Sequence, residues 1–164
     1  MISLRRITEA DSEQILRWRN SDEVRLFMSD QEPITLKDHQ AWLMARVEDP
    51  TNVGLIAEKS SVAVGFMQFN ILDTETTEWG FYKSPDAGPG LGREICTESI
   101  EWAKQNLSVS RVVAKVISTN IVSLKLHLGI GFELISEEAW LKLTGYERAA
   151  SAHKFFRRSV RGPG

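Results

Sequence analysis

The sequence predicts one mixed α/β domain in which a mostly antiparallel sheet is flanked by helices. Two apolar patterns follow one another along the chain. In some segments apolar residues alternate, as in strands, and in others they recur every three or four positions, as in helices. Three strand-like segments stand in a row between residues 52 and 84, with short polar turns between them. The predicted order of elements is therefore β-α-α-β-β-β-α-β-α-β-β.

The N-terminal third begins with a predicted strand at residues 2–8, because ISLRRIT alternates between apolar and polar positions. Asp11 is the expected N-cap of the helix that follows, since a glutamine stands three residues later. A short helical patch is expected at residues 21–30. Thr35, with an aspartate three residues on, is the start signal of the next helix.

The rest of the chain is predicted to form three strands, a helix, a strand, a helix and a closing antiparallel pair of strands. In this order the segments are residues 52–59, 61–72, 76–84, 92–107, 111–118, 120–129, 132–143 and 147–156. Asn120 is the expected cap of the second of these helices. The domain is expected to span residues 1–158, and the basic end at residues 159–164 is expected to be a flexible tail.

Composition argues against several classes of protein. The formal net charge is −2, from 20 basic and 22 acidic residues, which argues against nucleic-acid binding by bulk electrostatics. A single cysteine, Cys96, leaves no internal disulfide and no cysteine-based metal cluster, and no metal is expected. No apolar run approaches the roughly 18 residues of a membrane span, and the N-terminal sequence lacks a signal-peptide pattern. A cytoplasmic protein with no membrane partner is therefore expected.

The segment SPDAGPGLGREICTESI concentrates glycine just before a helix. Gly88, Gly90 and Gly92 fall within five residues. A glycine-rich loop at a helix N-terminus forms an anion site, because unpaired N–H groups and the helix dipole both favour negative charge. The loop lacks the Gly-Lys-Ser/Thr end of a P-loop and the glycine spacing of a dinucleotide-binding loop. Two interpretations stay open at this point: a pyrophosphate held by backbone amides, and a helix entry with an awkward turn.

A second motif, NIVSLKLHLGIGF, places Asn120, Ser123 and His127 on one helix ahead of a Gly-Phe pair. With the glycine loop and the element order, nearly the whole chain resembles the GCN5-related N-acetyltransferases, which transfer acetyl from acetyl-CoA to an amine. The resemblance implies acetyl-CoA as co-substrate. It implies three groups of contacts: the CoA pyrophosphate on Gly88, Gly90, Leu91, Gly92 and Arg93, the acetyl carbonyl near Phe81 and Tyr82, and the pantetheine arm near Asn120 and Ser123. Ala87 stands where the family usually has Gln or Arg, and Pro89 removes one amide donor.

The N-terminal third is similar to a narrower branch of this family. ILRWRNSDEVRLFM followed by ITLKDHQAWL resembles the acetyltransferases of pseudaminic acid biosynthesis, which acetylate a UDP-linked amino sugar. The resemblance implies that the acceptor is bound by Arg19, Asn20, Met28, His39 and Trp42. From the residues alone, Arg19 shares a helix face with an apolar isoleucine and needs a partner for its charge. A histidine such as His39, taken alone, is more often structural.

Two residues are candidates for proton transfer. His127 stands where related enzymes usually have a tyrosine beside the CoA sulfur, and it is expected to give a proton to the departing thiolate. Glu78 is the expected base, directly or through water. Each has a structural alternative: a histidine on the helix surface, and a cross-strand charge partner. Cys96 lies on the apolar stripe of its helix, which argues against a covalent cysteine intermediate.

The identity of the acceptor leaves alternatives open. Within the family these are a protein N-terminus, as in the ribosomal-protein enzymes, a polyamine or an aminoglycoside. A non-catalytic module that binds acyl-CoA or a nucleotide sugar is an alternative of another class. Arg19 and His39 favour an anionic UDP-linked 4-amino-4,6-dideoxy sugar over a polycation. The expected partner is thus a small-molecule acceptor and no nucleic acid, and a homodimer stays open.

Overall fold

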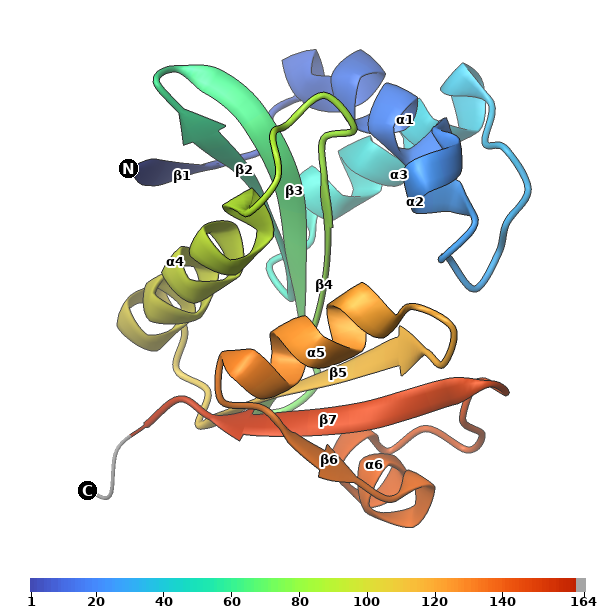
Figure 1. Cartoon of the computed structure of the whole chain (residues 1–164), viewed down its shortest axis with the longest axis vertical. Coiled ribbons are helices and arrows are strands. Elements are labelled where there is room, and N and C mark those ends of the chain that lie inside the picture. The colour runs from blue at the N-terminus through green and yellow to red at the C-terminus, as the bar shows by residue number, and fades with distance from the viewer. Residues whose placement is uncertain (162–164) are drawn as a thin grey trace.

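The strands of the chain build one seven-stranded sheet with helices on both faces, as shown by the computed structural model, which describes residues 1–161 (Figure 1). The strand order is β1-β2-β3-β4-β5-β7-β6, and all neighbouring pairs are antiparallel except the parallel pair β4 and β5. The strands are β1 (Ile2–Arg6), β2 (Asn52–Lys59), β3 (Val62–Ile71), β4 (Thr76–Lys83), β5 (Arg111–Ile117), β6 (Glu133–Ile135) and β7 (His153–Ser159). The helices are α1 (Ser12–Asn20), α2 (Asp22–Arg25), α3 (Leu36–Glu48), α4 (Leu91–Asn106), α5 (Ile121–Gly129) and α6 (Glu137–Thr144). The predicted mixed, mostly antiparallel α/β fold is confirmed. None of these helices in the described part of the chain has the length and apolarity to cross a membrane.

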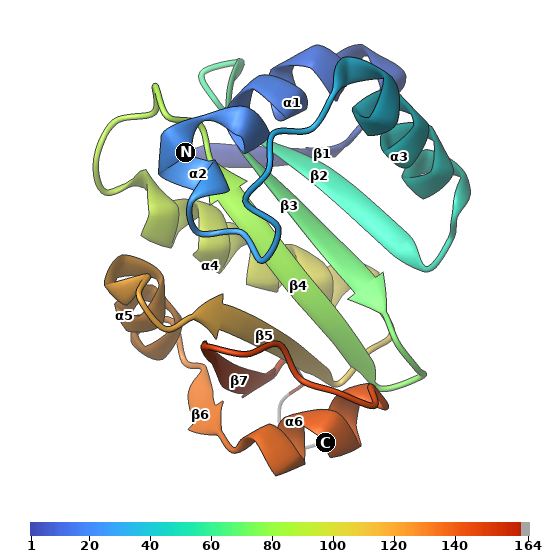
Figure 2. The ribbon, with the colours of Figure 1, turned by 90° about the vertical axis from the view of Figure 1, so that its right-hand side faces the viewer.

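Alternation along the strands sends successive apolar side chains to opposite faces of the sheet. Leu55 and Met67 belong to the core that includes the apolar stripe of α4, whereas their neighbours Ile56 and Phe66 pack with residues of α1 and α3. Figure 2 shows α4 on one face of the sheet and α1 and α3 on the other. Cys96 of α4 is fully buried, and burial raises the pKa of its thiol, so the group stays protonated. Its predicted place in the core is confirmed.

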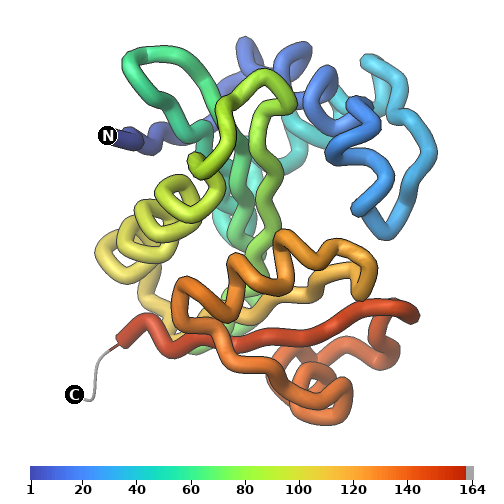
Figure 3. The backbone as a smooth tube through the Cα atoms, viewed as in Figure 1, coloured from blue at the N-terminus to red at the C-terminus, as the bar shows by residue number. Residues whose placement is uncertain are grey.

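β4 and β5 pair over a short ladder and then separate. The ladder ends at Glu78↔Val113, yet β4 continues to Lys83 and β5 to Ile117. Figures 1 and 3 show the two strands diverging past this ladder. The edge of β4 that would face β5 therefore carries backbone groups with no strand partner.

All three predicted N-cap residues stand at helix starts, and two of them make the side-chain hydrogen bond of a cap. Thr35 Oγ1 accepts a hydrogen bond from the Asp38 N–H at 3.2 Å at the start of α3. Asn120 Oδ1 accepts one from the Ser123 N–H at 3.2 Å at the start of α5. Each cap satisfies one of the N–H groups that a helix start leaves without an intrahelical partner.

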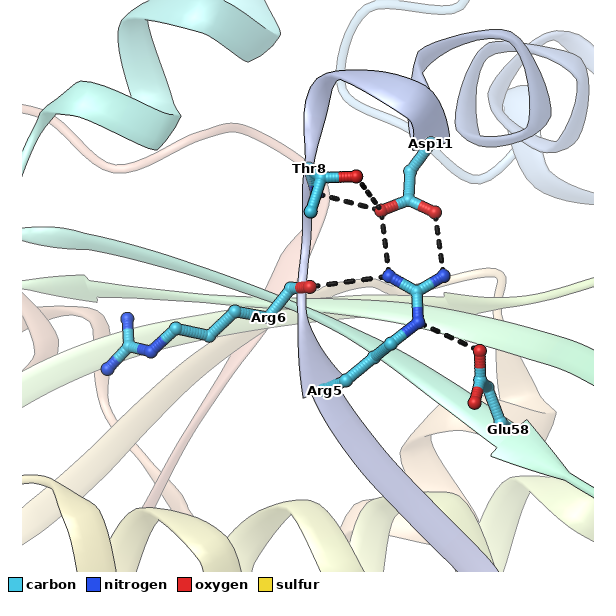
Figure 4. A network of polar contacts seen from close by, with 5 residues as sticks. All are labelled: Arg5, Arg6, Thr8, Asp11 and Glu58. Carbon is cyan, nitrogen blue, oxygen red and sulfur yellow. Dashed lines mark hydrogen bonds and ion pairs between the residues drawn. The ribbon is translucent and has the colours of Figure 1, made fainter. Parts of the chain in front are cut away.

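The third predicted cap, Asp11, has a different role (Figure 4). Arg5 donates two hydrogen bonds to its carboxylate, at 2.9 Å to Oδ2 and 2.8 Å to Oδ1, and the Thr8 N–H donates another at 2.8 Å. Asp11 holds the N-cap position of α1, as predicted, but its side chain makes no capping hydrogen bond among the described residues, because Asp11 ends a 3₁₀ turn, Glu9–Asp11, where its carboxylate faces Arg5 of β1. Arg5 also pairs with Glu58 of β2 at 2.8 Å, so the network ties the entry of α1 to the first two strands.

The prediction of a long strand at residues 132–143 was wrong over most of its length. Only β6 is extended, and α6 follows it after Ser136. The Ser136 hydroxyl accepts a hydrogen bond from the Ala139 N–H at 3.1 Å, two glutamates occupy the first turn, and Gly145 ends the helix with a left-handed φ of 75°. These start and stop signals outweigh the apolar alternation. Trp140, only 1% exposed, packs this helix against β5 and β7.

β7 begins later and ends later than the sequence predicts. It starts at His153, six residues after the expected start at residue 147, and it runs to Ser159. Val160 is buried, with 2% of its surface exposed. The packed part of the chain therefore extends past the predicted domain end at residue 158, and residues 162–164 of the predicted tail lie outside the described residues.

Candidate active site

A cavity of about 360 Å³ lies where β4 and β5 separate. Its wall is built from β3, β4, β5 and α5, together with Arg19 of α1, the segment 27–30 after α2, and His153 at the start of β7. The wall includes six residues predicted to contact the co-substrate or to transfer protons: Glu78, Phe81, Tyr82, Asn120, Ser123 and His127. Two residues of the predicted acceptor set, Arg19 and Met28, line the same cavity.

The glycine loop lies outside the cavity wall, at the start of α4. Gly90 has a φ of 85°, a left-handed conformation that residues with a side chain rarely adopt. Among the described residues no side chain caps this helix start, so its first N–H groups have no such partner. A Cβ placed on Gly88 or on Gly90 meets no atom of residues 1–161 within 4 Å. The Lys83 ammonium lies at the loop, 3.2 Å from the Gly88 oxygen. Open space, free amides and a nearby cation fit a pyrophosphate group.

His127 lies in the cavity wall with only 2% of its surface exposed. Its Nδ1–H donates to the Ser123 carbonyl oxygen at 2.8 Å, which fixes the tautomer because a carbonyl oxygen can only accept. The neutral ring then carries a lone pair on Nε2, and burial lowers the pKa of His127 below its ordinary value of 6.5. In this form the ring can accept a proton at Nε2 but has none to give there. The predicted donation to the thiolate therefore requires that the ring be protonated first.

Glu78 lies at the end of the β4–β5 ladder with its two carboxylate oxygens in different situations. Tyr146 donates a hydrogen bond from its hydroxyl to Oε1 at 2.8 Å. Oε2 is buried and has no hydrogen-bond partner among residues 1–161. The residues paired with Glu78 across the sheet are Asn70 and Val113, neither of which is charged. The alternative that Glu78 pairs with an opposite charge across the sheet is therefore wrong.

Arg19 places a buried cation in the cavity wall. It is 5% exposed, and its Nη2 donates to the Asp30 carbonyl oxygen. Its Nη1 is buried without a hydrogen-bond partner in the described part of the chain. The wall also contains the cation Lys115 and the carboxylates of Asp30 and Glu78, so cations and carboxylates are balanced in number.

Three residues of the predicted acceptor set do not line this cavity. The Asn20 amide donates to the Ile34 oxygen at 2.8 Å and accepts from the Ile34 N–H at 2.9 Å, which fixes the segment before α3. His39 is 2% exposed, with its Nδ1 3.2 Å from the Ser12 hydroxyl, and its ring centroid lies 5.3 Å from that of Trp42. These contacts join α3 to α1 and to the chain between them.

The side chains that sequence reasoning missed include Ser29 and His153 in the cavity wall, and Tyr146 behind it. The Ser29 hydroxyl and His153 Nε2 lie 3.3 Å apart, although 124 positions separate them in the sequence. Tyr146 reaches Glu78 from 68 positions away. No periodic signal could have found them, because two of the three lie in the region around α6 and the start of β7 that the sequence predicted incorrectly.

The site thus combines a polar cavity between two diverging strands with a helix start that no side chain caps among the described residues. The sequence model of one protein family, described as the acetyltransferase (GNAT) domain, matches residues 2–133, which is most of the chain. The chain therefore belongs to the GNAT acetyltransferase family and is an acetyl-CoA-dependent N-acetyltransferase.

The chain is also similar to individual acetyltransferases. The chain is 28% identical over 141 residues to acetyltransferase PseH of Campylobacter jejuni, covering 84% of this chain and 88% of the relative. The crystal structure of C. jejuni N-acetyltransferase PseH is similar with a TM-score of 0.69 at 19% identity, covering 96% of this chain and 97% of that one. Spermidine N-acetyltransferase from Vibrio cholerae, in complex with CoA and spermine, is similar with a TM-score of 0.81 at 14% identity, covering 97% and 95%. These structural similarities show the shared fold.

Proposed function

We propose that this acetyltransferase transfers acetyl from acetyl-CoA to the amine of a UDP-linked 4-amino-4,6-dideoxy sugar, as in pseudaminic acid biosynthesis. Arg19 is the observation that carries the proposal. Its guanidinium is buried in the cavity wall with Nη1 unpaired among the described residues. A buried cation without a full set of acceptors is costly, and a diphosphate group of a bound nucleotide sugar supplies them. The similarity to PseH supports the same acceptor class.

The charges of the cavity wall favour this acceptor over a polycation. A polyamine or an aminoglycoside brings several ammonium groups and is best held by an excess of carboxylates. The wall holds only Asp30 and Glu78 against Arg19 and Lys115. The apolar and aromatic wall residues, among them Met28, offer soft contact to a 6-deoxy sugar or a base.

The co-substrate is proposed to lie between α4 and α5. The amides from Gly88 to Arg93 hold the pyrophosphate at the open, uncapped start of α4. The unpaired edge of β4 near Phe81 supplies backbone donors for the acetyl carbonyl. Asn120 lines the wall on the α5 side, where the pantetheine arm is expected.

Proton transfer is proposed to use Glu78 and His127 in sequence. Acetyl-CoA supplies an activated acetyl thioester. Glu78 takes a proton from the acceptor ammonium, directly or through water, so that the amine can attack. Nε2 of His127 takes the proton that nitrogen loses as the C–N bond forms, and gives it to sulfur as the C–S bond breaks. The products are the amide, the thiol and one proton, and the protein is left unchanged.

Arg19→Ala tests the acceptor. It should weaken binding of UDP, measured by titration calorimetry, by about tenfold or more because charge-assisted hydrogen bonds to phosphate are lost. Affinity for CoA should stay within about twofold of the parent protein. Lys37→Ala, which removes an exposed cation from α3, is the control and should change neither affinity. Equal losses of UDP and CoA affinity in Arg19→Ala would show that Arg19 is structural.

A further inference from the structure

The loop after α6 reaches the cavity through one hydroxyl. Tyr146 donates a hydrogen bond to Glu78 Oε1 at 2.8 Å, and the two residues are 68 positions apart in the sequence. Tyr146 is partly exposed and does not itself belong to the cavity wall, whereas Glu78 does. The contact therefore links a wall residue to an element behind the wall.

This hydrogen bond makes the two oxygens of Glu78 unequal. Oε1 is occupied by the tyrosine hydroxyl, while Oε2 is buried and has no partner among residues 1–161. A buried carboxylate oxygen without a donor costs free energy. An oxygen in the situation of Oε2 is expected where a bound substrate supplies the missing donor. The hydrogen bond to Oε1 also restricts rotation of the carboxylate, which would otherwise exchange the two oxygens.

The structure of α6 holds the tyrosine in place. Gly145 ends α6 with a left-handed φ of 75°, and the Tyr146 N–H then donates to the Thr144 hydroxyl at 3.3 Å. The Tyr146 ring lies 6.5 Å from the ring of the buried Trp140, centroid to centroid. Burial, and then the bond to Glu78, raise the pKa of the Tyr146 hydroxyl, so it remains a donor at neutral pH.

We propose that Tyr146 is a positioning residue for the reaction: its hydroxyl anchors Glu78 Oε1 so that Oε2 is presented to the acceptor amine or to the water that relays its proton. This role rests on the proposed function of Glu78 as the base. It explains why α6 and its left-handed end matter to a site built on β4 and β5. Tyr146 acts only through Glu78 and touches no reacting atom.

Tyr146→Phe tests the proposal because it keeps the ring and removes only the hydroxyl. The assay follows free thiol with acetyl-CoA and whichever of two acceptors is acetylated faster, a UDP-linked 4-amino-4,6-dideoxyhexose or spermidine. We expect kcat to fall about tenfold, since an interaction that orients a charged group is lost, with the KM for acetyl-CoA unchanged. In a Glu78→Gln background the same change should alter kcat by less than about twofold, because the two residues act as one unit.

The control is Ser136→Ala, which removes the N-cap hydroxyl of α6 without touching Glu78. It should lower the unfolding midpoint in denaturant while leaving kcat unchanged. Equal kcat losses in Ser136→Ala and Tyr146→Phe would overturn the proposal in favour of a structural role for α6. Additive losses from Tyr146→Phe and Glu78→Gln would overturn it as well.

The same assay separates this proposal from the proposed function. If Glu78→Gln lowers kcat and Tyr146→Phe does not, the positioning role fails and the base remains. If Glu78→Gln leaves kcat unchanged, the base assignment fails and the positioning role fails with it. Faster acetylation of spermidine would contradict the proposed acceptor and still leave the role of Tyr146 measurable.

Discussion

The ring of His127 is held through Nδ1, which donates to the Ser123 carbonyl oxygen at 2.8 Å and lies 3.4 Å from the Ser123 hydroxyl. Aromatic rings of Trp79, Phe132 and Phe156 surround it, with centroids 5.7, 5.0 and 5.3 Å away. A phenol at this position would hold a proton to give at neutral pH, whereas the imidazole offers a lone pair on Nε2. In the proposed mechanism, a histidine where the resemblance implies a tyrosine therefore changes the order of events: the ring has to receive a proton before it can deliver one to sulfur.

The pH dependence of kcat tests this order. Because burial lowers the pKa of His127 below 6.5, the ring is neutral and ready to accept above that pH. We expect kcat to hold between about pH 7 and pH 8.5 and to fall as acid protonates Nε2. His127→Gln should lower kcat by about 10²- to 10⁴-fold and leave the KM for acetyl-CoA nearly unchanged. A kcat that falls with rising pH above 6.5, in the parent but not in His127→Gln, would show a simple acid instead.

At the scale of elements, the start of α4 is the part of the site that sequence alone indicated most clearly. The glycine spacing predicted a turn that opens a helix, and Gly90 has the left-handed φ that such a turn needs. Gly88 is different, since it has no left-handed φ and a Cβ on it meets no atom of the described part of the chain within 4 Å. The fold therefore does not itself require glycine at position 88, which is what a close approach of a ligand would explain.

Gly88→Val tests that explanation. The valine meets open space and a tolerated backbone conformation, so the unfolding midpoint should not fall. If the CoA pyrophosphate lies over the loop, the side chain should raise the KM for acetyl-CoA by about tenfold or more. The KM for the acceptor is the internal control and should not change. An unchanged KM for acetyl-CoA would remove the pyrophosphate from this loop.

Other elements show where prediction from sequence stops. Caps such as Thr35 and Asn120 were predictable because their bonds stay within one turn of the chain. The position of Asp11 at the start of α1 was predictable too, but the bonding of its side chain was not, because Arg5 of β1 donates both hydrogen bonds to its carboxylate. The segment around Trp140 was predicted as a strand because its apolar residues also fit alternation, and only its cap and left-handed end identify α6.

At the scale of the whole molecule, the cavity exists because β4 and β5 stop pairing at Glu78↔Val113. Strand identity could be predicted from the apolar pattern, but the point at which two parallel strands diverge depends on tertiary packing and leaves no local signature. Arg19 and His127 could be named from the sequence because they lie in motifs that resemble a known family, whereas Tyr146 lies in no such motif. Its position follows from the path of the chain between α6 and β7.

Turnover across a panel of amines tests the central claim most directly. Free thiol would be measured with acetyl-CoA and each of four acceptors: a UDP-linked 4-amino-4,6-dideoxyhexose, spermidine, an aminoglycoside and a peptide with a free N-terminus. The account predicts the highest kcat/KM for the UDP-linked sugar, because only this acceptor brings a diphosphate to the buried Nη1 of Arg19, which has no partner among residues 1–161. A higher kcat/KM for spermidine, the aminoglycoside or the peptide would contradict it.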